Sequence, residues 1–93
     1  MTPYKTFAER IIHEQELVVG PIAWMEARKV SGLQVTDEKK GEISIVGDGK
    51  QVLEALVMQY DRLFGGASRE VCKSAIVDLI STVSRSELPE ILL

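Results

Sequence analysis

The sequence predicts an α+β fold in which four main helices pack on one two-stranded antiparallel hairpin, in the order α-α-β-β-α-α. Three observations predict it. Apolar residues recur at helical spacing in four segments, and strict alternation occurs only on the two sides of one polar turn. Glycine or proline separates consecutive segments. A chain of 93 residues has the length of one domain, so we expect a single domain over 1–93.

The first helix is expected to begin at Thr2-Pro3 and to end before Gly20-Pro21. Threonine can cap a helix, and proline suits the first helical position because its missing N–H would have no partner there. One face carries the apolar residues Tyr4, Phe7, Ala8, Ile11 and Val18. Pro21 cannot continue this helix, so the chain should turn a corner at Gly20 and start a second helix.

The second helix is expected over Pro21–Val30, with Gly32 as its C-terminal cap. Ile22, Ala23, Ala27 and Val30 form one face, and Trp24 and Met25 project away from it. A helix that is apolar on most sides is usually buried on most sides. Two interpretations stay open: this helix is the centre of the core, or one side of it meets a partner.

The hairpin is predicted from the alternation in Leu33–Thr36 and Glu42–Ile45, which flank the turn sequence DEKKG. The apolar side chains of both strands should point toward the helices. Two strands alone are marginal in water, so helix packing is required. Each strand also leaves an open edge, at which a second copy of the chain could pair.

The third helix should start at Asp48, a good N-cap, and end at Gly65-Gly66. Ser68 is expected to cap a fourth helix, whose apolar stripe continues to Val83. The gap between these two helices is short, which indicates an antiparallel pair. The final segment, SELPEILL at 86–93, is expected to form a short helical turn with a docked apolar end.

Composition argues against several functional classes. The formal net charge is −3 and the pI is near 5.1, so we expect no nucleic-acid binding, which usually needs a basic face. The longest uncharged apolar stretch is Leu17–Met25, nine residues, whereas a membrane-spanning helix needs about 20. A single cysteine rules out a disulfide within the chain. The N-terminus lacks an apolar signal region, and we expect a cytoplasmic protein without membrane contact.

No catalytic, cofactor-binding or metal-ligating residue is predicted. His13-Glu14 resembles part of a zinc-protease motif, but the second histidine is replaced by Leu17. Gly47–Lys50 resembles part of a phosphate-binding loop, but the residue after the lysine is not Ser or Thr, so we interpret it as a helix start. A weak anion site there stays open. Cys72 lies within an apolar stripe and is interpreted as a buried structural residue.

The favoured function is a non-catalytic protein-interaction or regulatory module that forms a homodimer through apolar surface. Tryptophan and methionine are enriched at the centres of interfaces. The contact is expected at the helix over 21–30, at the hairpin edge or at the C-terminal tail. The candidate interface residues are Trp24, Met25, Met58, Val77, Ile91 and Leu92.

Two alternatives belong to other classes. The first is a domain that binds a small apolar ligand, in a pocket lined by Trp24, Tyr60 or Phe64. The second is an enzyme whose active site is assembled across subunits, since short chains can complete a site by association. The partner, the ligand and the symmetry of any oligomer are not predicted from the sequence.

Overall fold

The structure, a computed structural model, describes residues 3–93 and confirms the predicted α+β fold and its element order. The predicted cap at Thr2 lies outside the described residues. The helices and strands are α1 (Tyr4–Val19), α2 (Ile22–Ala27), β1 (Leu33–Asp37), β2 (Glu42–Ile45), α3 (Gly49–Phe64) and α4 (Gly66–Ala75). Three short 3-10 turns follow, at Ile80–Thr82, Arg85–Glu87 and Glu90–Leu92.

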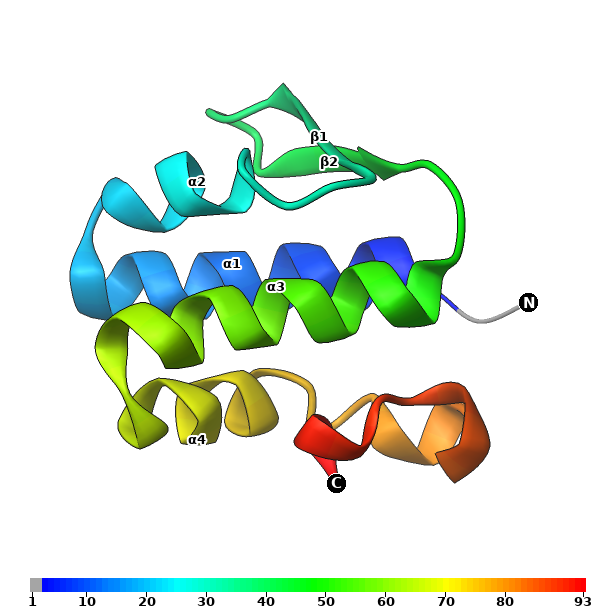
Figure 1. Cartoon of the computed structure of the whole chain (residues 1–93). Helices are drawn as coiled ribbons and strands as arrows, with labels where there is room; N and C mark the ends of the chain where they lie inside the picture. Colours follow the sequence, from blue (N-terminus) through cyan, green and yellow to red (C-terminus); the bar gives the residue numbers. More distant parts are fainter. Residues whose placement is uncertain (1–2) are drawn as a thin grey trace.

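Two long helices, α1 and α3, lie side by side through the middle of the molecule (Figure 1). The short helix α2 and the hairpin lie on one side of this pair, and α4 with the C-terminal turns lies on the other. Helix α4 runs back along α3 in the opposite direction, which confirms the predicted antiparallel pair. This arrangement places α1 in contact with α2, α3, α4 and β2.

The core is formed where these layers meet. Its largest fully buried side chains include Trp24, Tyr60 and Phe7, from α2, α3 and α1. The Tyr60 hydroxyl donates a hydrogen bond of 2.7 Å to the carbonyl oxygen of Ala23, which ties α3 to α2. A buried tyrosine needs such a partner, because an unpaired hydroxyl in an apolar core is costly.

The hairpin has the predicted strands, with β1 extended by one residue to Asp37. Leu33 pairs with Ile45 and Val35 with Ile43, and the register shifts between Val35 and Asp37. The backbone N–H of Ile43 donates to Oε2 of Glu9 at 3.0 Å, so it points away from β1 and toward α1. One of the two open edges expected from the sequence is therefore covered by α1 at this point.

Helix α2 ends at Ala27, three residues before the predicted end at Val30. The backbone turns through residues 28–32 instead, and Gly32 adopts a positive φ of 86° next to β1. Val30 still packs into the core, at 6% exposure. The apolar spacing that suggested a longer helix is thus satisfied by a turn that carries the chain into the hairpin.

The predicted boundaries of the fourth helix are wrong at both ends. Helix α4 starts at Gly66 and stops at Ala75, whereas the predicted cap was Ser68 and the predicted stripe reached Val83. Ser68 lies inside the helix, where its buried hydroxyl accepts a 2.8 Å hydrogen bond from Nε2 of Gln15. Beyond Ala75, turns with i→i+3 hydrogen bonds keep apolar residues toward the core at nearly helical spacing.

The C-terminal segment ends as predicted, with a short helical turn at Glu90–Leu92. Leu92 is 2% exposed and docks against α3 and α4. The turn before it is closed by a capping box, in which Ser84 and Glu87 satisfy each other's backbone N–H groups. Tyr4 Oη donates to the Glu87 carbonyl oxygen at 2.6 Å, so the start of α1 holds the end of the chain.

Candidate functional site

Two of the predicted interface residues lie in the core of their own chain. Trp24 and Leu92 are each 2% exposed, so neither side chain presents surface to a partner. Ile91 is half-buried and packs against the same core. Helix α2 packs against α1, and the Trp24 ring lies next to the hairpin turn. The side of α2 that carries Trp24 therefore faces the core.

The other three predicted residues are exposed but are not brought together. Met25 is 60% exposed on α2, Met58 is 47% exposed on α3, and Val77 is 68% exposed in the turn after α4. Helices α2 and α4 lie on opposite sides of the α1–α3 pair (Figure 1). Met25 on α2 and Val77 in the turn after α4 therefore lie on different parts of the surface.

An exposed apolar surface instead surrounds the turn between α1 and α2. We call it the α1–α2 corner and define it by Leu17, Val18, Pro21, Ile22 and Met25, all of them exposed. Leu17 and Val18 are 69% and 65% exposed, and Ile22 and Met25 are 39% and 60% exposed. No charged residue occurs between Leu17 and Met25. The most apolar stretch of the chain is thus largely on the surface.

The backbone conformation of Gly20 forms the turn of this corner. Gly20 has a φ of 81°, which favours glycine, and its N–H donates to the Glu16 carbonyl oxygen at 2.8 Å. Its own carbonyl accepts the N–H of Ala23 at 3.0 Å, so α2 starts immediately. A side chain built at Gly20 would meet nothing within 4 Å, which shows that the turn is open to solvent.

Sequence reasoning missed Leu17, Val18 and Ile22 as surface residues. The sequence predicts Val18 and Ile22 on the apolar faces of the first two helices, but both are exposed in the structure. The uncharged stretch over 17–25 is the signal that could have identified this surface. Leu63, 50% exposed in the last turn of α3, lies toward the same end of the molecule, because α1 and α3 end there (Figure 1). Val46, Met58 and Val77 are also exposed elsewhere, whereas the α1–α2 corner gathers several exposed apolar side chains around one turn.

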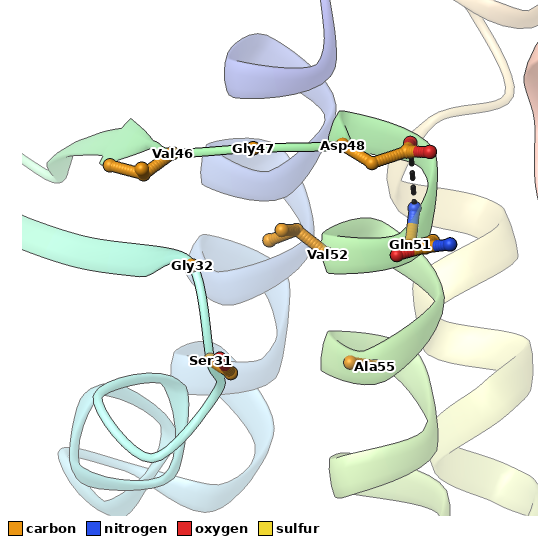
Figure 2. Close-up of a pocket in the computed structure, with 8 residues that line it drawn as sticks. All are labelled: Ser31, Gly32, Val46, Gly47, Asp48, Gln51, Val52 and Ala55. Atoms are coloured by element: carbon orange, nitrogen blue, oxygen red, sulfur yellow. Dashed lines mark hydrogen bonds between the residues drawn. The ribbon is translucent and has the colours of Figure 1, made fainter.

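A pocket of about 380 Å³ lies between the first turns of α3 and the two loops at the base of the hairpin (Figure 2). It is lined by Ser31, Gly32, Val46, Gly47, Asp48, Gln51, Val52 and Ala55. The Asp48 carboxylate accepts the backbone N–H groups of Lys50 at 2.9 Å and Gln51 at 3.3 Å. This confirms that Asp48 caps the helix.

The groups that an anion would use at this helix start are largely engaged elsewhere. Two of the first backbone donors of α3 are taken by Asp48, whose own negative charge repels an anion. The ammonium group of Lys50 is turned away to the C-terminal segment, where it donates to the Ser86 carbonyl oxygen at 2.9 Å. The arrangement at Gly47–Lys50 is that of a capped helix start.

Two further pockets have volumes of about 260 and 490 Å³. The smaller one lies between α1 and the hairpin turn, and the larger one lies between the start of α1 and the outer edge of β2. None of the three pockets is lined by Trp24, Tyr60 or Phe64. The pocket that the apolar-ligand alternative required is not among them.

The buried reactive groups have structural partners. Burial raises the pKa of the Cys72 thiol to about 11, and Gln15 Nε2 lies 3.3 Å from its sulfur. Hydrogen bonds from Gln59 and Lys29 lower the pKa of the Glu26 carboxyl, which is 5% exposed. Among residues 3–93, no three His, Cys, Asp or Glu side chains are grouped so that they could hold a metal ion.

Within the described part of the chain, no helix combines the length and the apolar character that crossing a membrane requires. No protein-family model, curated protein or solved structure matches the chain.

Proposed function

We propose that this protein is a non-catalytic interaction module that self-associates through the α1–α2 corner. The observation that supports the proposal is the exposure of Leu17, Val18, Ile22 and Met25 around one turn, with no charge between the first and the last. Single exposed apolar residues are normal on a protein surface, but a contiguous apolar patch marks a contact site.

The composition of the corner matches the centre of an interface. Charged residues are depleted there in known complexes, and methionine is enriched. Removing apolar surface from water contributes roughly 25 cal/mol per Å², so covering these side chains is favourable. Met25 adds an unbranched, adaptable side chain that can fit the surface opposite.

The corner is also held in place. Ala23 and Trp24, on the inner face of α2, are buried, and the Tyr60 hydroxyl bonds to the Ala23 carbonyl oxygen. The exposed face of α2 is therefore carried by a helix that is fixed to the core. A surface that is fixed before contact loses less conformational entropy on binding.

We favour a second copy as the partner because an uncharged surface needs no complementary charge opposite it. In a two-fold dimer the same patch occurs on both subunits, so apolar side chains meet apolar side chains. The projecting position of Gly20 leaves room for such an approach.

The test compares Val18→Glu with Val77→Glu. The two valines are 65% and 68% exposed, so the substitutions place the same charge at equally exposed positions, one inside the corner and one outside it. Light scattering after size-exclusion chromatography gives the mass. We expect a dimer for the wild type and for Val77→Glu, and a monomer for Val18→Glu, with unchanged circular dichroism in all three.

A wild-type protein that is monomeric at every concentration accessible to light scattering would refute self-association. If Val77→Glu dissociates the dimer and Val18→Glu does not, the contact lies elsewhere and the assignment to the corner is wrong.

A further inference from the structure

A pocket of about 260 Å³ lies where the middle of α1 faces the hairpin turn. Helix α1 contributes Thr6, Glu9, Arg10 and His13, and the turn contributes Lys40 and Gly41. Thr6, Arg10 and His13 follow one another at helical spacing and so share one face of α1. The pocket thus gathers a guanidinium, an ammonium, an imidazole and a hydroxyl from two elements.

Arg10 is held by contacts with the end of α4 and the turn that follows it. Its Nη1 donates to Oδ1 and Oδ2 of Asp78, at 2.8 and 3.1 Å, and lies 3.4 Å from the Ala75 carbonyl oxygen. All three contacts use Nη1. Within residues 3–93, no hydrogen bond involves its Nη2 or Nε, so two sides of the guanidinium keep their donors for another group.

The single carboxylate in the lining is already engaged. Oε2 of Glu9 accepts the backbone N–H of Ile43 at 3.0 Å and lies 3.7 Å from the ammonium of Lys5. The neighbouring carboxylates are engaged as well: Asp78 accepts from Arg10, and Asp37 accepts the backbone N–H of Lys40 at 3.1 Å. Within residues 3–93 no ion pair involves the Lys40 ammonium, so its charge is available to a ligand.

The only tryptophan of the chain supports the turn side of this pocket. Gly41 has a φ of 72°, and a Cβ atom built there would lie 3.8 Å from two carbons of the Trp24 ring. The Trp24 ring therefore lies next to the backbone of the turn at Gly41, the residue that follows Lys40. It also gives the pocket a fluorescent reporter.

We propose that this pocket binds a small oxyanion of the phosphate class, as the free ion or as a phosphate ester. The fixed guanidinium presents its remaining donors, and Lys40 supplies the second charge from across the pocket. Thr6 and His13 add donors at its rim. Charge-assisted hydrogen bonds of this kind are the strong ones, and planar arginine donors suit tetrahedral oxyanions.

The experiment titrates the protein with inorganic phosphate at constant ionic strength, with chloride as the balancing ion, because salt screens exposed charges. Trp24 fluorescence and the amide resonance of Gly41 report binding. We expect a saturable change that is weakened about tenfold by Lys40→Gln, the loss expected for one charge-assisted contact. His13→Gln should weaken it to a smaller extent.

Lys39→Gln is the matched control, because Lys39 is an exposed neighbour of Lys40 that does not line the pocket. It should leave phosphate affinity unchanged. Equal weakening by both lysine variants would show general charge attraction and would overturn the proposal, as would a linear, non-saturating response. Glycerol 3-phosphate shows whether the pocket admits an ester: binding of either the ion or the ester supports the proposed oxyanion site.

Discussion

The backbone at Gly32 closely approaches both the Val46 carbonyl group and Val52, and replacing Gly32 with alanine should be far more damaging than the same change at Gly47. Both glycines have a positive φ, 86° at Gly32 and 92° at Gly47, and both line the pocket shown in Figure 2. A Cβ atom at Gly32 would lie 2.7 Å from the Val46 carbonyl oxygen and 2.8 Å from Cγ2 of Val52. At Gly47 it would meet nothing within 4 Å.

The stability lost in Gly32→Ala is expected to have two separate causes. Holding an alanine in the left-handed region costs about 1–2 kcal/mol, which both variants share. The overlap at Gly32 adds about 1–3 kcal/mol, as overpacking usually does. The overlap cannot be relieved cheaply, because the Val46 N–H donates to the Gly32 carbonyl oxygen at 2.8 Å and Val52 belongs to the first turns of α3. We expect Gly32→Ala to lose about 3 kcal/mol, roughly 12–25 °C in Tm.

Urea denaturation followed by circular dichroism measures both variants against the wild type. Gly47→Ala should lose only about 1–2 kcal/mol, so the difference between the two variants isolates the overlap. Equal losses in Gly32→Ala and Gly47→Ala would show that the loop after α2 does not approach β2 and α3 as closely as described.

Three further predictions concern buried polar groups. Tyr60→Phe should lose about 1–2 kcal/mol, since it leaves the Ala23 carbonyl oxygen without its hydroxyl partner; an unchanged melting temperature would contradict this contact. Because burial raises the pKa of Cys72 to about 11, its thiol should react with a disulfide reagent at pH 8 only after unfolding, and equal rates in native and unfolded protein would show an accessible thiol. The hydrogen bond from Gln59 lowers the pKa of Glu26 below its ordinary value of 4.5, so the stability it adds is present above that pH and is lost as pH falls through the lowered value. The stability difference between wild type and Glu26→Gln should therefore shrink on acidification, and a constant difference would refute the linkage.

The predicted elements that were confirmed depend on short-range chemistry. The hairpin follows from alternation around a glycine-ended turn, and the start of α3 follows from the Asp48 carboxylate, which satisfies two backbone N–H groups. The corner at Gly20-Pro21 follows from proline itself, which cannot continue a helix. In each case the residues that decide the structure are neighbours in the sequence.

The boundaries that were wrong involve contacts between distant segments. Ser68 can cap a helix, but in the folded chain its hydroxyl accepts from Gln15, 53 residues earlier. The apolar residues beyond Ala75 have helical spacing, but turns with i→i+3 hydrogen bonds can bury the same residues. Spacing alone therefore could not distinguish a continued α-helix from a series of turns.

The sequence by itself determined the order of the elements, the strands of the hairpin and the starts of α2 and α3, because propensity, capping and proline geometry act within a few residues. Only the tertiary structure decided which side of α2 is buried. Trp24 and Met25 are adjacent and both apolar, and packing against α1 and the hairpin turn covers the first and leaves the second 60% exposed. Tertiary packing also places Arg10 and Lys40 in the lining of one pocket. It brings Arg10 within hydrogen-bond distance of Asp78, 68 residues later in the chain. No periodicity encodes these choices, because burial is decided by which faces meet once all the helices are in place.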